Sequence, residues 1–172
     1  MKAIATPFSC LALLFFPTAC GGGFSSGFEG DARLDELTLE ETTELCESEA
    51  EYRRRRLDEE FQKEMSCYVF AISVARGSGE ACLSELESCL DREPRDRCVN
   101  VREPASDATI AEYEQCVEDT LQRDLEKERE AKARFTFECE PDGWDDELRW
   151  MDESKWWTKP ESCDGVAVSW WR

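Results

Sequence analysis

The chain has 172 residues and is strongly acidic, with 40 Asp and Glu against 21 Lys and Arg, a formal net charge of −19. A field of that sign repels phosphate backbones, so we expect no nucleic-acid partner. Histidine is absent, which excludes Ser-His-Asp and Cys-His nucleophiles, His-containing zinc sites and imidazole acid–base chemistry. We therefore expect a protein that is not an enzyme and has no cofactor.

Residues 1–19 have the features of a secretory signal peptide. One cation, Lys2, precedes an apolar stretch, and the small residue Ala19 stands just before Cys20. The apolar stretch is too short to span a bilayer as a permanent helix. We exclude these residues from the fold. Without Lys2 the remaining chain has 20 basic and 40 acidic residues, a net charge of −20.

Cysteine arithmetic assigns a role to Cys20. The chain has ten cysteines, and Cys10 leaves with the signal peptide, so nine remain. An odd number strands one thiol in an oxidising compartment. If Cys20 carries acyl chains, eight cysteines remain and all of them can pair. The alternative is a Cys20 that stays free or forms an intermolecular disulfide.

The segment "PTAC" at 17–20 resembles the lipobox of bacterial lipoproteins. Ala19 matches the small residue that precedes the family's cysteine, whereas Pro17 stands where the family prefers leucine. Gly21, rather than aspartate, follows the cysteine, which in that family implies delivery to the outer membrane. The resemblance implies a lipid anchor at the bacterial outer membrane, facing the periplasm or the cell surface. Residues 20–31 would then be the lipidated cysteine and a flexible Gly/Ser tether.

Three helices are predicted in residues 32–134, which form a cysteine-rich helical domain. The first, over 38–68, opens with a capping box and keeps apolar residues at helical spacing without a break. Its four consecutive arginines at 53–56 have acidic residues four positions away, so we expect them to pair on a solvated face. The second helix covers about 78–91, with Ser78 as its N-cap, and Pro94 follows its end.

The third helix opens with a second capping box, Thr109 and Glu112, and continues to about residue 134. Its apolar seam stops at Leu125, so we expect the last turns to be exposed to solvent. A helix-opening cysteine and the motif of Thr109, Tyr113 and Cys116 resemble uncharacterised small cysteine-rich lipoproteins predicted from myxobacterial genomes. That resemblance covers about 38–121 and implies a location and an architecture, because the family has no established activity.

Residues 135–172 form an acidic tail module that contains all six tryptophans. The segments "RFTFEC" and "VAVSWW" favour short strands, so the predicted fold is mainly α, a disulfide-stapled three-helix up-down-up bundle with a β-containing appendage. The acidic run "EPDGWDDE" lacks the ligand spacing of an EF-hand loop, and we expect no metal site. The candidate binding residues are the tryptophans, which either bind a partner or form the tail's own core: Trp144, Trp150, Trp156, Trp157, Trp170 and Trp171.

The remaining cysteines have no Cys-x-x-Cys spacing, which favours disulfides over redox, zinc or iron–sulfur sites. They are Cys46, Cys67, Cys82, Cys89, Cys98, Cys116, Cys139 and Cys163. Helix geometry excludes Cys82–Cys89 and Cys46–Cys67, because residues on one helix rise about 1.5 Å per position and those pairs lie too far apart. An up-down-up bundle favours Cys67–Cys82. Among Cys46, Cys89, Cys98 and Cys116 three pairings stay open, with a preference for Cys46–Cys116 and Cys89–Cys98, and the tail keeps Cys139–Cys163.

The sequence therefore predicts a cell-envelope lipoprotein that acts as a non-catalytic interaction or adhesion module. The alternatives are a structural envelope component, or carbohydrate binding through the Trp-rich tail. Partners are the membrane, through the N-terminal lipid, and either a basic protein, which the acidic charge favours, or an envelope glycan.

Overall fold

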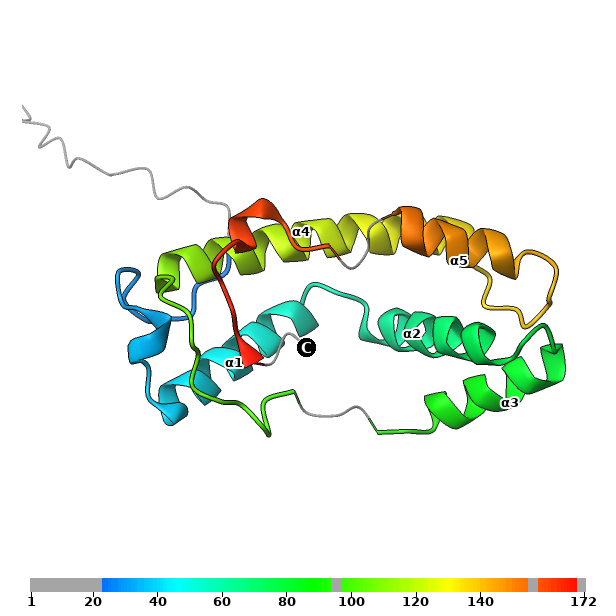
Figure 1. Cartoon of the computed structure of the whole chain (residues 1–172), viewed down its shortest axis with the longest axis horizontal. Helices are drawn as coiled ribbons and strands as arrows, with labels where there is room; N and C mark the ends of the chain where they lie inside the picture. The colour runs from blue at the N-terminus through cyan, green and yellow to red at the C-terminus, as the bar shows by residue number, and fades with distance from the viewer. Residues whose placement is uncertain (1–22, 94–96, 155–157, 170–172) are drawn as a thin grey trace, which may run out of the picture.

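The computed structural model describes residues 23–93, 97–154 and 158–169. Five α-helices and four disulfides within these residues confirm the mainly helical, disulfide-rich fold. Figure 1 shows α1 and α2 following one another along α4, with α3 folded back beside α2, an arrangement compatible with the predicted three-helix bundle. The elements are η1 (Leu34–Glu36), α1 (Leu39–Arg54), α2 (Glu59–Val74), α3 (Gly79–Leu90), α4 (Ile110–Arg134), α5 (Trp144–Glu153) and η2 (Glu161–Cys163).

The predicted helix starts are confirmed. Thr38 and Thr109 each accept from the backbone of a glutamate three residues on, and that glutamate returns to the threonine backbone, which completes both capping boxes. Ser78 caps α3 by accepting from the Ala81 amide. Local capping chemistry therefore defines where α1, α3 and α4 begin.

The prediction of one unbroken helix over 38–68 is wrong, because the chain turns at 55–58 between α1 and α2. Asp58 starts α2 by accepting from the Phe61 amide at 3.1 Å. The buried Glu128 of α4 accepts from the Asp58 amide at 3.2 Å and from the Gln62 side chain at 3.0 Å. The turn is thus held by a carboxylate from α4, which supplies partners for donors that a helix start leaves open.

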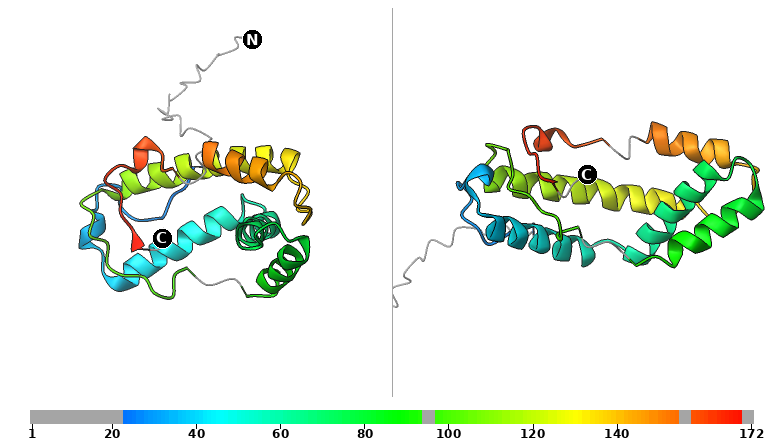
Figure 2. Two further views of the ribbon diagram at one scale, coloured as in Figure 1. Left: turned by 45° about the vertical axis from the view of Figure 1, so that its right-hand side comes forward. Right: turned by 60° about the horizontal axis from the view of Figure 1, so that its bottom comes forward.

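The apolar interior is divided into two clusters, which we name core 1 and core 2. Figure 2 shows from two further sides the helices that contribute to them. Core 1 lies between α1 and the first half of α4 and includes Leu45, Ile110 and Val117. Core 2 lies among α2, α3, α5 and the end of α4 and includes Met65, Tyr68 and Ala131. Of the regular elements in the described residues, α4 alone contributes buried residues to both cores. α4 is the common support of the two halves.

The described part of the predicted tether is packed, so the expectation of a flexible coil over 20–31 is wrong from residue 23 onward. Phe24 is 7% exposed, and its ring centroid lies 5.1 Å from that of Tyr52. The Phe24 amide donates to Glu118, and the Ser26 amide and hydroxyl both donate to Glu114. Farther on, Ile110 donates its amide to the Ala32 carbonyl at 2.8 Å. The N-terminal segment is part of core 1.

Two expectations for the C-terminal half also need correction. The end of α4 is not wholly solvated, because Glu128 and Ala131 are buried against core 2. The described tail contains no strand. It forms α5, whose Trp144, Leu148 and Met151 follow helical spacing. In the described residues the sole β-type pairing is an isolated bridge between Arg33 and Thr109.

All eight cysteines predicted to pair do form disulfides, but every preferred partner was wrong. Cys67–Cys82, Cys46–Cys116, Cys89–Cys98 and Cys139–Cys163 do not occur. The disulfides are Cys46–Cys98, Cys67–Cys89, Cys82–Cys139 and Cys116–Cys163. The two exclusions on helix geometry, Cys82–Cys89 and Cys46–Cys67, agree with the structure.

The length of α2 explains the first error. α2 continues to Val74, seven positions past Cys67, so Cys67 lies about 10 Å from the end of the helix. In the antiparallel α2–α3 pair, Cys89 in the last turn of α3 is therefore at the same level, whereas Cys82 lies near the connection. Cys82 is left to meet Cys139, which follows α4.

Candidate functional site

The cysteines predicted as site residues fall into two groups. Cys20, the predicted lipidation site, lies outside the described residues. The other eight form disulfides that each connect elements of one core, two disulfides to a core. No disulfide in the described residues connects core 1 with core 2. Each half is cross-linked independently, and the connection between them depends on α4 and the loops.

The tryptophans are only partly placed. Trp144 is 6% exposed and belongs to core 2. Trp150 is half-buried, with its ring 5.3 Å from Phe135 and Arg134 stacked on it at 5.7 Å. These two indoles therefore pack within the fold. Trp156, Trp157, Trp170 and Trp171 lie outside the described residues.

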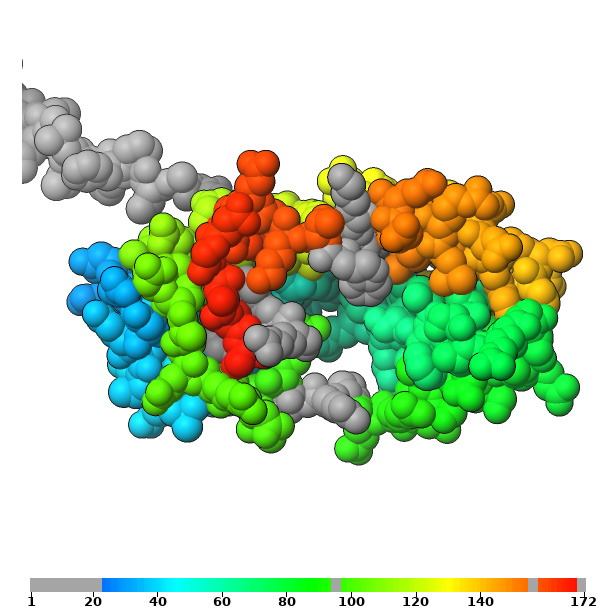
Figure 3. All heavy atoms as spheres, viewed as in Figure 1, coloured from blue at the N-terminus to red at the C-terminus, as the bar shows by residue number. Residues whose placement is uncertain are grey.

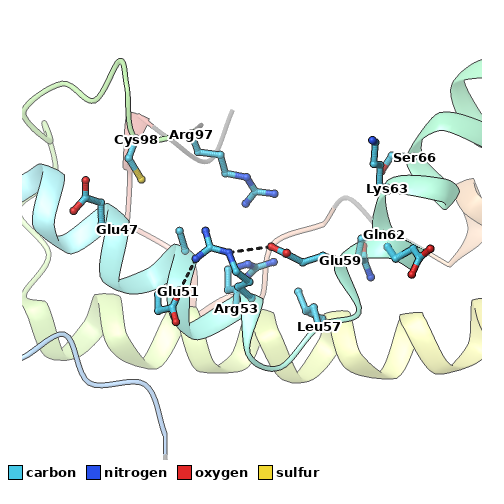
Figure 4. A pocket seen from close by; sticks show the side chains of 13 residues that line it. Glu47, Glu51, Arg53, Leu57, Glu59, Gln62, Lys63, Ser66, Arg97 and Cys98 are labelled. Carbon is cyan, nitrogen blue, oxygen red and sulfur yellow. Dashed lines mark hydrogen bonds and ion pairs between the residues drawn. The ribbon is translucent and has the colours of Figure 1, made fainter. Parts of the chain in front are cut away.

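A cleft of about 1070 Å³ lies where the two halves meet, and no sequence pattern indicated it. One side is formed by α1 and the start of α2, and the other by Arg97 and Cys98. Figure 4 shows Glu47, Arg97 and Cys98 on the side of α1 opposite α4. Arg53 and Gln62, which also line the cleft, reach α4 through Asp124 and Glu128. The space-filling view in Figure 3 shows the surface hollowed between the two halves. Clefts between packed units are common places for ligands and partners.

Positive and negative charges alternate along the cleft. Arg54 pairs with Glu51 of α1 and, at 3.2 Å, with Glu59 of α2, so it connects the helices across the turn. Arg53 pairs with Asp124 of α4 at 2.5 Å. Of the ion pairs predicted for residues 53–56, Glu51–Arg55 forms at 2.8 Å. Arg56 stacks on the Tyr52 ring. The charged side chains of the cleft balance to near neutrality, unlike those of the acidic chain around it, and apolar atoms make up the larger part of its surface.

Helix-to-helix contacts are reinforced by tyrosine–glutamate hydrogen bonds. The chain has three tyrosines, and each donates its hydroxyl to a glutamate of another helix. The bonds are Tyr113 to Glu49 at 2.6 Å, Tyr52 to Glu118 at 2.5 Å and Tyr68 to Glu147 at 2.7 Å. Hydrogen bonds to a charged acceptor contribute about 1.5–3 kcal/mol each. The first two stabilise core 1 and the third joins α2 to α5.

These bonds shift the pKa of the groups that make them. Burial and the bond to Glu118 raise the pKa of Tyr52 to about 12, and burial with the bond to Glu147 raises the pKa of Tyr68 as well. Burial alone would raise the pKa of Glu118, yet its hydrogen bonds from Tyr52, Gln122 and the Phe24 amide together lower it. The carboxylate is thus kept ionised where it holds the N-terminal segment.

Alkaline titration should reveal these bonds. A folded-state pKa above the unfolded value of about 10 means that the Tyr52 bond stabilises the fold below pH 10 and that this stabilisation is lost as the pH rises through about 12. We expect tyrosinate absorbance of the folded protein to appear later than that of the denatured chain. The Tyr52→Phe variant should lose part of that delay. Full tyrosine ionisation near pH 10 with the helices intact would contradict the bonds.

The described residues bring together no group of three acidic or cysteine side chains suited to hold a metal ion. The acidic residues Asp145, Asp146 and Glu147 instead occupy the first turn of α5, where negative charge is favourable. None of the helices in the described ranges has the length and apolar character that crossing a membrane requires. Comparisons with family models, curated proteins and solved structures gave no match to this chain.

Proposed function

We propose that the protein is a cell-envelope lipoprotein, anchored through Cys20, that acts as a non-catalytic interaction module. The observation that carries the proposal is the complete pairing of the eight cysteines between Cys46 and Cys163 into four disulfides. Disulfides form and persist in oxidising compartments outside the cytoplasm. Because these eight leave no partner within the mature domain, the cysteine after the signal-like segment is available for acylation.

The interaction role rests on a surface rather than on a reactive group. A cleft lined by side chains of both signs of charge, with a largely apolar surface, lies at the junction of two cross-linked halves. A rigid body with an open cleft suits recognition of a partner, because little ordering is needed on binding. A basic protein is the favoured partner class, since the net charge of −19 attracts cations over long range.

A structural role in the envelope is the second candidate, and a salt-sensitive interaction distinguishes the two. Capture of cationic proteins that weakens steeply with ionic strength supports the interaction module. Carbohydrate binding through the tail would now depend on Trp156, Trp157, Trp170 and Trp171, because Trp144 and Trp150 pack within the fold. Loss of glycan binding on replacement of Trp156 or Trp157 would favour that alternative.

Substitution Cys20→Ser tests the anchor. Multiple acyl chains contribute about 0.8 kcal/mol for each buried methylene, so the wild type should stay with membranes until detergent is added. The variant should be released or mislocalised and should keep its helices, because it retains all four disulfides and the buried residues of both cores. Cys10→Ser is the matched control and should leave the mature protein unchanged. A wild-type protein that is soluble and begins at another residue would contradict the anchor.

A further inference from the structure

The chain between the predicted anchor and the folded body is very short. From Phe24 onward the N-terminal segment is fixed on α4 and α1, and only Gly21, Gly22 and Gly23 separate Phe24 from Cys20. Extended residues advance at most about 3.6 Å each, so Phe24 lies within about 14 Å of Cys20 whatever path the chain takes. A flexible tether of the kind expected from sequence would have allowed a longer and unoriented reach.

The docking of this segment involves several independent contacts. The Phe24 ring packs on Tyr52 and lies 6.1 Å from Tyr113. The Ser26 amide donates to Glu114 at 2.6 Å and the Phe24 amide to Glu118 at 3.2 Å. These carboxylates are directed at backbone donors of the segment. They therefore hold the attachment point on the surface of α4 instead of facing solvent as free charges.

The attachment point and the cleft are on different sides of the molecule. The segment runs along α4, whereas the cleft lies between α1, the start of α2 and the loop residues Arg97 and Cys98, which are on the side of α1 opposite α4 (Figures 1 and 4). A body on a connection of at most about 14 Å keeps its attachment side near the bilayer, because turning that side fully away would force the body into the lipid. The cleft is then presented away from the membrane.

We infer that the bilayer is the partner of the face formed by the N-terminal segment and the first half of α4, and that this contact fixes the orientation of the protein. The inference rests on the proposed lipid anchor. It adds a defined membrane-facing surface and an outward-facing cleft, which places the charged residues Arg54, Glu59 and Arg97 where a soluble partner reaches them.

Paramagnetic relaxation tests the orientation. The full acylated protein, isotope-labelled, is placed in phosphatidylcholine nanodiscs that contain a gadolinium-chelating lipid. Amides of Ser26 and Glu114 should relax several-fold faster than amides of Glu47 and Arg97, which line the cleft. Equal relaxation of the two sets, or faster relaxation at the cleft, would overturn the inference.

Two controls separate this inference from the anchor itself. The mass of the N-terminal peptide reports acylation of Cys20 directly, so an unacylated peptide counts against the proposed function and not against the geometry. A Gly/Ser insert of about ten residues between Gly22 and Gly23 adds a mean reach of roughly 17 Å. It should reduce the difference between the two sets of amides several-fold while leaving the protein acylated. An unchanged difference would show that the short connection is not its cause.

Discussion

Reduction of the four disulfides should unfold the protein. The loops they close contain 22 to 57 residues, and loop entropy gives each disulfide about 3–4 kcal/mol. Together they match the total stability of a typical domain, about 5–15 kcal/mol. Far-ultraviolet circular dichroism and thermal melting with and without reductant measure the effect. A melting curve that reductant leaves unchanged would show that the disulfides do not hold the fold.

Removing one disulfide at a time should show that the stabilisation by each disulfide increases with the length of the loop it closes. The Cys67–Cys89 loop is the shortest, with a sequence separation of 22, and Cys82–Cys139 is the longest, with 57. Replacing both cysteines of the longer loop with serine should cost about 1 kcal/mol more than replacing both of the shorter one. Denaturant unfolding of the two double variants gives this difference directly. The reverse order would contradict the loop-entropy explanation.

Phe24→Ala should strongly destabilise the protein although the residue lies in a Gly/Ser-rich segment. Truncation of a buried phenylalanine costs about 3–5 kcal/mol, and we expect the lower end because the segment is near the end of the chain. The variant loses the packing on Tyr52 and exposes the hydrogen bonds to Glu114 and Glu118. Denaturant unfolding and amide exchange at Ser26 report the two consequences separately.

Phe70→Ala is the matched control. Phe70 has 43% of its surface exposed on α2, so its truncation removes little packing and should change stability by less than about 1 kcal/mol. If both variants are as stable as the wild type, the N-terminal segment is a tether and is not part of core 1. Amide exchange at Ser26 should then also be fast in the wild type.

The sequence indicated the helix starts but not the break between α1 and α2. Thr38, Ser78 and Thr109 are strong N-caps, and capping is a local property that can be seen in a few residues. Asp58 followed by two glutamates is also an N-cap signal. The apolar residues Leu57, Phe61 and Met65 nevertheless keep helical spacing through the turn, and that spacing indicates one continuous helix. Periodicity alone does not distinguish one long helix from two that continue in the same direction.

Tertiary contacts account for the other errors. The disulfide partners follow from where α2 ends and from the return of the tail over α4, and both are set by packing between distant segments. The packing of Phe24 could not be predicted from the Gly/Ser-rich segment around it, because composition does not show that two tyrosines of α1 and α4 leave a place for its ring. The cleft has no sequence signature, since its charges come from three separate segments. The helix α5 could have been predicted from the sequence, because Trp144, Leu148 and Met151 are spaced as on one face of a helix.

A peptide map of the unreduced protein tests the division into two independently cross-linked halves most directly. Trypsin alone leaves Cys82 and Cys89 in one peptide, because no Lys or Arg lies between them, so a glutamate-specific protease is added to cut after Glu85 or Glu87. The linked peptides should be Cys46–Cys98, Cys67–Cys89, Cys82–Cys139 and Cys116–Cys163. A link between the halves, such as Cys89–Cys98, or free thiols among these eight, would contradict it.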